Sequence, residues 1–156
     1  AIMDPWQEQV WQFDDESFRR SFQVNLISAV MLCNAVVPSM MERGRGVVVN
    51  LVSGIDRLPS LSPYAVSKAA IMKYTHDIVP ALEGTGVRMN ALDPGWLRTD
   101  MGSEEAPSAV ESVLPGALVP LLVDSDVSGH RFEAQDYAGM SLEQAVRAAE
   151  QRLNSA

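Results

Sequence analysis

Cysteine is nearly absent from the 156-residue sequence, in which Cys33 is the one thiol. A single thiol cannot form a disulfide within the chain, so a reducing compartment and a cytoplasmic location are the simpler expectation. We expect Cys33 to serve as a small buried hydrophobic residue rather than as a redox group or a nucleophile.

Basic clusters and unbroken apolar runs are also missing. The net charge is −8, from 20 acidic and 12 basic side chains, and no Lys/Arg cluster is present, which argues against a nucleic-acid partner. Residues 1–6 have neither the basic flank nor the apolar run of a secretory signal. Polar residues and Pro38 interrupt the most apolar stretch, 24–41, whereas a membrane span needs about 20 nearly unbroken apolar residues. We therefore predict a buried helix there, with no membrane partner, and we predict no metal site.

We expect residues 1–156 to form a single domain, since 47% of the residues are hydrophobic and can form one core. Helices and strands are expected to alternate along this domain. The β-branched run 47–52, bounded by glycine, predicts a strand buried on both faces. Pro80 should kink or shorten the last turn of the second long helix. The expected elements are helix 14–43, strand 47–52, helix 62–83, strand 87–92, a weak helix over 107–123, strand 130–135 and a final amphipathic helix from Ser141. This alternation predicts a parallel α/β sheet.

Tyr64 and Lys68 lie four residues apart near the start of the second long helix. Four residues advance a helix by about 6 Å and slightly more than one turn, so the phenol and the ammonium emerge on one face. A free tyrosine has a pKa of about 10, and a nearby cation favours the phenolate, which would make it a usable base near neutral pH. Such a pair also arises by chance on solvated helices, so the spacing alone is weak evidence.

Two neighbouring segments strengthen the case for a site. Ser53 follows the first strand, eleven residues before Tyr64, and Pro94 to Thr99 follow the second strand. In a parallel sheet, ligands bind at the carboxyl ends of the strands. A hydroxyl there can donate to a substrate oxygen, and a turn there exposes backbone groups to a planar amide.

At these residues the sequence resembles the short-chain dehydrogenase/reductase family. The matching motifs occur in the family's order and cover about residues 10–136, whereas 137–156 form a C-terminal helix outside the pattern. They are Phe22-Gln23-Val24-Asn25, Asn50-Leu51-Val52-Ser53, Tyr64-Ala65-Val66-Ser67-Lys68 and the segment Asp93 to Thr99. The resemblance implies an α/β fold of Rossmann type, with a parallel sheet and flanking helices, and an NAD(P)-dependent oxidoreductase that interconverts an alcohol and a carbonyl.

The resemblance also implies roles for individual residues. Tyr64 would be the general acid/base, Lys68 would lower its pKa and bind the nicotinamide ribose, and Ser53 would hold the substrate carbonyl. Asn25 would position a water in a proton relay. Hydride passes between nicotinamide and substrate, so the protein supplies placement and electrostatics. Tyr64 and Lys68 would also contact the cofactor, either NAD or NADP, and the remaining cofactor-binding residues would be Pro94, Gly95, Leu97 and Thr99.

Each of these residues has a structural alternative. Asn25 could satisfy buried backbone groups, Ser53 could be an ordinary hydroxyl at a strand end, and Thr99 could cap a helix. A whole-chain alternative is a non-catalytic oligomerisation or scaffold piece of the same descent. An epimerase or dehydratase of the extended branch would share Tyr64 and Lys68, but Pro94 to Thr99 favour a reductase.

The family's N-terminal βαβ half, with its glycine-rich phosphate-binding loop, has no counterpart in the sequence. Strand 47–52 would consequently keep an open apolar edge. We expect this edge to recruit the N-terminal segment, or the chain to form a homo-oligomer through helices 14–43 and 62–83. Residues 100–122 are the expected substrate lid, and their apolar side chains Met101, Val110, Val113 and Leu114 suggest an apolar wall but identify no substrate.

Overall fold

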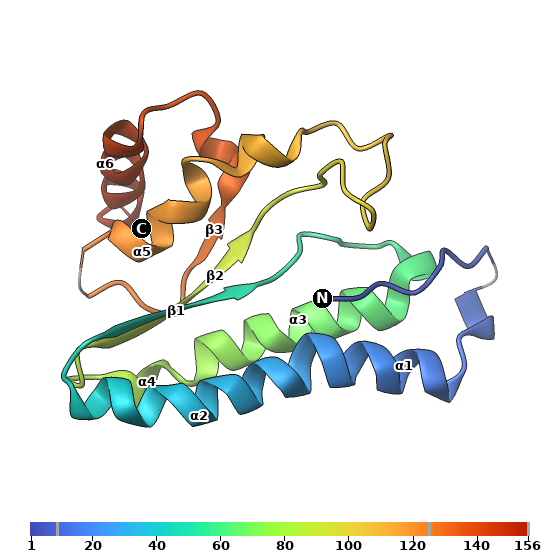
Figure 1. Cartoon of the computed structure of the whole chain (residues 1–156), viewed down its shortest axis with the longest axis horizontal. Coiled ribbons are helices and arrows are strands. Elements are labelled where there is room, and N and C mark those ends of the chain that lie inside the picture. Colours follow the sequence, from blue (N-terminus) through green and yellow to red (C-terminus); the bar gives the residue numbers. More distant parts are fainter. Residues whose placement is uncertain (9, 125, 156) are drawn as a thin grey trace.

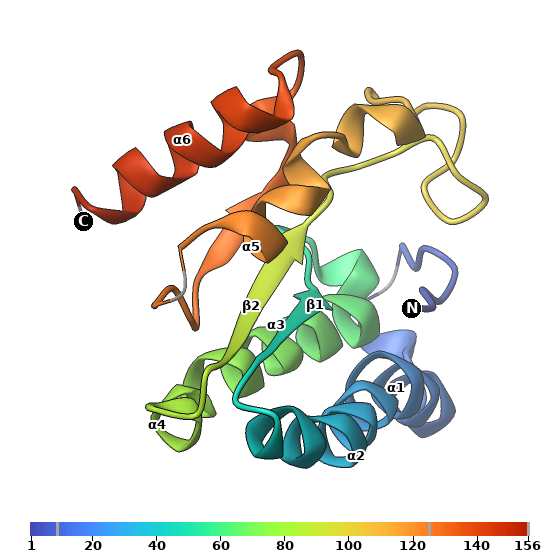
Figure 2. The same cartoon turned by 60° about the vertical axis from the view of Figure 1, so that its left-hand side comes forward.

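Three parallel strands form the centre of the protein in the computed structural model, which describes residues 1–8, 10–124 and 126–155 (Figure 1). The strands are β1 (Gly46–Leu51), β2 (Val87–Asp93) and β3 (Arg131–Glu133), in the order β1-β2-β3. Helices α1 to α4 cover one face of the sheet, and α5 and α6 cover the other (Figure 2). This arrangement confirms the predicted Rossmann-like parallel sheet with flanking helices.

The two outer strands pair in parallel with β2, which is buried along nearly its whole length. β1 differs from the prediction, because most of its residues are only half-buried and Leu51 is exposed. The reason is topological: within the described residues, no strand pairs with the far side of β1. A strand at a sheet edge lacks the neighbour that would complete its burial.

The predicted helix 14–43 forms as a continuous helical stretch with a wider turn in its middle. It comprises α1 (Asp15–Phe22), a π-helical turn (Gln23–Ile27) and α2 (Ser28–Glu42). The Asp14 side chain caps its start by accepting a hydrogen bond from the Ser17 amide at 2.8 Å. The π turn places Asn25 in the buried part of the helix.

This helical stretch is less buried than predicted. By length and composition, Asp15–Glu42 could cross a membrane. In the fold one side packs beneath the sheet and along α3, where Cys33 is buried with Met89. The other side leaves apolar side chains exposed, because no described residue covers it. These side chains lie on α2 and on the π-helical turn before it, and are called here the apolar face of α2. They are Val24, Ile27, Met31, Leu32 and Val36.

The second long helix is interrupted where the sequence contains proline. α3 (Ser62–Asp77) follows a 3₁₀ turn (Pro59–Leu61), and a separate short helix α4 (Val79–Leu82) begins after Ile78. Pro80 lies in the first turn of α4, where its missing N–H is not needed. The expected shortening of the helix by Pro80 is confirmed.

Residues 107–123 form short helical pieces rather than one helix, because Pro115 and Pro120 interrupt the segment. The pieces are 3₁₀ turns at Val110–Val113 and Gly116–Leu118, followed by α5 (Val119–Leu122). A further 3₁₀ turn (Ala134–Tyr137) leads from β3 to α6 (Leu142–Leu153), and another (Val10–Gln12) precedes α1. Ser141 caps α6 as predicted, in a capping box with Gln144.

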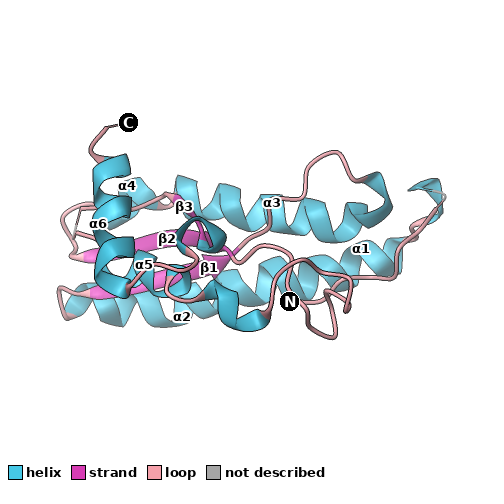
Figure 3. Ribbon diagram, turned by 90° about the horizontal axis from the view of Figure 1, so that it is seen from above, coloured by secondary structure: helices cyan, strands magenta, loops and turns pink. Residues whose placement is uncertain are grey.

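Helices flank the sheet (Figure 3), and hydrophobic clusters fill the space between helices and strands on both faces. Small side chains of α6, Ala145 and Ala149, let this helix pack closely on Val119 and Phe132. On the opposite face, Ile71 of α3 packs with Ala91 of β2. Both helix layers therefore hold the central strand rigidly, and the loops after its carboxyl end inherit that position.

Candidate active site

The carboxyl ends of β1 and β2 and the first turns of α3 meet in one region. Val52 extends the pairing of β1 through a 2.9 Å hydrogen bond to the Leu92 carbonyl, which places Ser53 directly beside the end of β2. The chain after Ser53 then runs to the start of α3, which carries Tyr64 and Lys68 (Figure 1). Three of the predicted site residues therefore converge at this edge.

Lys68 is almost fully buried, at 4% exposure. Its Nζ donates a hydrogen bond to the Leu51 carbonyl oxygen at 2.7 Å, and lies 5.9 Å from the centre of the Tyr64 ring. Burial lowers the pKa of this ammonium below its usual value, while the negative charge of Asp93 acts in the opposite direction. Within the part of the chain that the structure describes, the Leu51 carbonyl is the one hydrogen-bond acceptor for an ammonium that has three donors.

Tyr64 is half-buried, and its phenol interacts with the Ser53 hydroxyl. Burial raises the pKa of Tyr64, a hydrogen bond with Ser53 lowers it, and the charge of Asp93 raises it further. The direction differs from the expectation that the ammonium brings the phenol towards neutral pH. The reason is that Lys68 lies against the ring and bonds to Leu51, so desolvation of the phenol is the larger effect.

Asn25 is buried, and its amide makes three hydrogen bonds. Its Nδ2 donates to the Ile2 carbonyl at 2.8 Å and to Ser67 Oγ at 3.0 Å, and its Oδ1 accepts from the Ile2 amide at 2.7 Å. Ser67 in turn donates to the Tyr64 carbonyl at 2.7 Å. Asn25 therefore anchors the N-terminal segment to α3, which is the backbone-satisfying alternative for this residue. The water-positioning role stays a prediction.

The segment after β2 forms a turn at the same edge. Gly95 has φ of 80°, a conformation that suits glycine, and Gln135 Nε2 donates to the Pro94 carbonyl at 2.9 Å. Leu97 bridges to Ser108, and Thr99 Oγ1 accepts a 3.1 Å hydrogen bond from the Gly102 amide. Thr99 thus stabilises a turn rather than the start of a helix, so its helix-cap alternative is wrong, and the nicotinamide contact of this segment stays a prediction.

Sequence analysis did not identify an ion pair at this edge. Asp93 ends β2 and is paired with Arg131 of β3 at 2.8 Å. No clear signal for this pair was present in the sequence, because Asp93 follows the end of the expected strand 87–92 whereas Arg131 lies near the start of the expected strand 130–135. The register that pairs Ala91 with Arg131 comes from the fold. Of the expected lid residues, Met101, Val110 and Leu114 are exposed and Val113 is half-buried.

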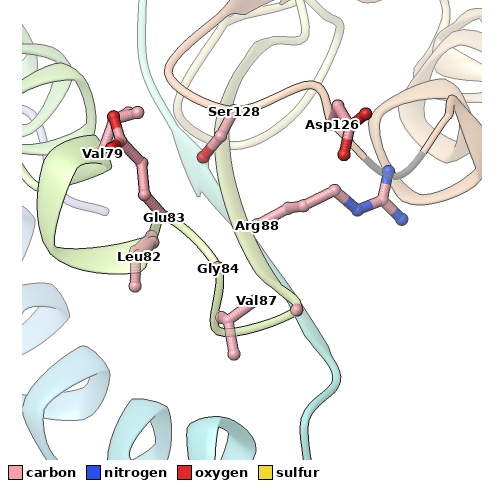
Figure 4. Close-up of a pocket in the computed structure, with 9 residues that line it drawn as sticks. Val79, Leu82, Glu83, Gly84, Val87, Arg88, Asp126 and Ser128 are labelled. Atoms are coloured by element: carbon pink, nitrogen blue, oxygen red, sulfur yellow. The ribbon is translucent and has the colours of Figure 1, made fainter.

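A hollow lies at the opposite end of β2, and none of the candidate site residues lines it. Figure 4 shows Leu82, Glu83, Arg88 and Ser128 around it. The Arg88 guanidinium is already engaged, because it donates to the Val123 carbonyl at 2.5 Å. This hollow is separate from the candidate site at the carboxyl ends of the strands.

The parallel sheet with flanking helices places this protein in the Rossmann-like α/β class. The cluster of Ser53, Tyr64 and Lys68 lies at the carboxyl edge of that sheet. The family model described as short chain dehydrogenase matches residues 3–109, which is more than half of the chain. The protein is therefore a member of the short-chain dehydrogenase/reductase family.

Named relatives agree with this assignment. Dehydrogenase/reductase SDR family member 4 of Mus musculus is 34% identical over 105 residues, which are 66% of this chain and 38% of the relative. The 2-keto-3-deoxy-L-fuconate dehydrogenase of Xanthomonas campestris is 36% identical over 96 residues, 60% of this chain and 32% of the relative. The chain thus spans about a third of these curated proteins.

Solved structures show the same fold. A 3-oxoacyl-[acyl-carrier protein] reductase from Brucella melitensis with bound NAD is 26% identical, with a TM-score of 0.73, and the match covers 85% of this chain and 57% of that one. An NADPH-bound carbonyl reductase from chicken fatty liver is 19% identical, with a TM-score of 0.75 over 90% of this chain and 63% of that one. The second match supports the fold alone.

Proposed function

We propose that this chain is the catalytic portion of an NAD- or NADP-dependent oxidoreductase that interconverts an alcohol and a carbonyl. One observation supports the proposal most directly. The phenol of Tyr64 interacts with the hydroxyl of Ser53, and the buried ammonium of Lys68 lies one helical turn further along α3. A proton donor, a second hydroxyl and a cation at one edge of a parallel sheet suit the reduction of a carbonyl.

The residues present fit the nicotinamide half of the cofactor. Lys68 has donors to spare for ribose hydroxyls, and the turn at Pro94 and Gly95, with Leu97 and Thr99 after it, lies at the same edge. When bound, the nicotinamide supplies or accepts the hydride. The loop and helix that hold cofactor phosphates in this family have no counterpart among these 156 residues, so we expect this chain alone to be inactive.

The proposed roles follow from position. Ser53 holds the substrate oxygen by a hydrogen bond, and Tyr64 exchanges a proton with that oxygen. Lys68 orients the ribose and places a positive charge over the Tyr64 ring. Asn25 holds the start of the chain, at Ile2, against Ser67 of α3. Exposed apolar lid residues such as Met101 and Leu114 favour a substrate with an apolar part.

A panel of carbonyl compounds, offered to the natural full-length protein with NADH and with NADPH, tests this proposal. We expect oxidation of one nicotinamide, followed at 340 nm, with at least one small aldehyde or ketone, and no turnover by residues 1–156 alone. Binding of neither nicotinamide by the full-length protein in calorimetry would contradict the proposal.

The second candidate function is a non-catalytic oligomerisation or scaffold piece. The exposed apolar face of α2 and the unpaired edge of β1 favour it, because both surfaces offer contacts to another polypeptide. The same surfaces also suit an enzyme that assembles before it acts. The scaffold function differs from the enzyme in being indifferent to loss of the Tyr64 hydroxyl.

We further propose that residues 1–156 form a single domain in the cytoplasm, without nucleic-acid or membrane partners. We also propose that this domain associates with another polypeptide. The partner is either the family's N-terminal βαβ half, at β1, or another copy of the chain, through α1–α2 and α3.

Leu32 is 65% exposed on the apolar face of α2, so Leu32→Glu should weaken self-association in light scattering. Leu142→Glu, at 38% exposure on α6, is the matched control and should leave the mass unchanged. A monodisperse monomer without additional polypeptide by intact mass would contradict the association.

A further inference from the structure

Asp93 connects three segments of the candidate site by direct contacts. It ends the central strand β2 and is 5% exposed. Its Oδ1 accepts a hydrogen bond from the Gly95 amide at 2.9 Å, and its Oδ2 accepts one from Arg131 Nη2 at 2.8 Å. Both carboxylate oxygens are therefore engaged, one with the turn after β2 and one with β3.

The loop after β1 lies directly on this ion pair. A Cβ added at Gly54, the residue after Ser53, would be 2.6 Å from Arg131 Nη2 and 2.8 Å from Asp93 Oδ2. A larger side chain at this position would have to displace the ends of both side chains, so glycine lets the loop lie directly on the Asp93–Arg131 pair. The pair is therefore in contact with the loop that carries Ser53.

The charges around Asp93 do not cancel. Arg131 Nη2 also pairs with Glu133 at 2.6 Å, so one guanidinium serves two carboxylates. Arg131 is 36% exposed at its side chain, whereas Asp93 is 7% exposed, which leaves the guanidinium better screened by water than the carboxylate it balances. Asp93 follows Leu92, the partner of Leu51 in the β1–β2 register, and Lys68 Nζ bonds to the Leu51 carbonyl, so the carboxylate lies at the strand ends that Lys68 contacts. The titratable and charged groups around Asp93 are Arg131 and Glu133 from β3, and Tyr64 and Lys68 from α3.

We propose that Asp93 is a positioning residue, clamped between Gly95 and Arg131, that holds the Ser53 loop against the turn after β2 and presents an incompletely balanced negative charge to Tyr64 and Lys68. Arg131 is the second half of the device, because it limits how much of that charge reaches α3. The proposal goes beyond the proposed function, which assigns no role to either residue, and it rests on that function only in taking Tyr64 as the proton-exchanging group.

The charge of Asp93 raises the pKa of both Tyr64 and Lys68. Asp93→Asn keeps the size of the side chain and an oxygen for the Gly95 amide but removes the charge, so both groups should titrate at lower pH. Arg131→Gln leaves the charge of Asp93 unbalanced, so both groups should titrate at higher pH. We expect the titration midpoints to move by roughly 0.3 to 1 on the pH scale, less than a charge in direct contact would move them.

Nuclear magnetic resonance of residues 1–156, labelled in the tyrosine ring and at the lysine ε-carbon, measures these titrations without turnover. The spectra are simple, because Lys68 and Lys73 are the only lysines and the chain has three tyrosines. Asp77→Asn is the matched control, since it removes an equally charged side chain that pairs with Lys73 on the exposed side of α3. The control should leave the titrations of Tyr64 and Lys68 unchanged.

Shifts of opposite sign in the two variants support the inference, because a purely structural role would not separate them by sign. Shifts in the same direction, or none, would overturn it. Should Asp93→Asn fail to fold, Arg131→Gln alone decides, by raising or not raising both titration midpoints.

In the natural full-length enzyme, the pH profile of alcohol oxidation should move with the Tyr64 titration, to lower pH in Asp93→Asn and to higher pH in Arg131→Gln. An active enzyme whose profile does not move would contradict this inference and leave the proposed function intact. Opposite titration shifts in a protein without turnover would do the reverse.

Discussion

Tyr64→Phe should reduce turnover of the full-length enzyme by about 10²- to 10⁴-fold, the contribution that a positioned general acid or base typically makes. The substitution removes only the phenolic oxygen that meets Ser53, and keeps the ring against which Lys68 lies. The loss should therefore appear in kcat, with KM for the nicotinamide nearly unchanged. Steady-state kinetics at saturating cofactor measures both constants.

Tyr74→Phe is the control for this substitution. Tyr74 is a half-buried tyrosine on the same helix, where it packs between the cluster of Cys33 and Met89 and the cluster of Ile71 and Ala91. It is ten residues, about three helical turns, beyond Tyr64. Its variant should retain full turnover. Equal activity of Tyr64→Phe and the unaltered enzyme would instead favour the scaffold function, for which the hydroxyl is irrelevant.

Lys68→Met should lower kcat/KM by about tenfold to more than 100-fold, because a hydrogen bond to a charged group contributes about 1.5–3 kcal/mol and each 1.4 kcal/mol is a factor of ten. Methionine approximates the buried stem of Lys68 but has no ammonium for the ribose hydroxyls or for the phenolate. Unlike the tyrosine variant, it should weaken nicotinamide binding as well as turnover. Calorimetric titration of the full-length protein with NADH and NADPH separates the two effects.

Lys73→Met is the matched control, one turn and a half further along α3. Lys73 is exposed and pairs with Asp77, so its loss should change neither constant by more than about twofold, as for other exposed ion pairs. If both lysine variants lose activity equally, the effect comes from the helix rather than from a site. If neither does, Lys68 has only the structural role of bonding to Leu51.

Local patterns were sufficient for most elements of the fold. The β-branched run at 47–49 and the apolar strand before Asp93 formed as predicted, because strand propensity and glycine boundaries are encoded within a few residues. The position of Pro80 predicted the break between α3 and α4 for the same reason. Residues 107–123 were predicted less well, since two prolines divide a weakly helical segment into pieces whose ends are set by packing.

Burial was harder to predict than element type. The run 47–52 is as apolar as a strand covered on both sides and both edges, yet β1 is half-buried because the strand that would lie beside it is not among the described residues. The helix over 24–41 is apolar on more than one side, yet only the side towards the sheet and α3 is covered. Apolar character thus shows what a segment is able to bury, while neighbours decide what is buried.

By itself, the sequence determined the residue types at the candidate site and their order along the chain, because a Tyr and a Lys four apart on a helix must share a face. Only the tertiary structure decided how these groups affect one another. The hydrogen bond of Lys68 to Leu51, the use of the Asn25 amide on Ile2, and the Asp93–Arg131 pair under Gly54 join residues 17 to 77 positions apart in the chain. Charges and desolvation act through space, so the proton affinities at this site depend on which segments the fold brings together.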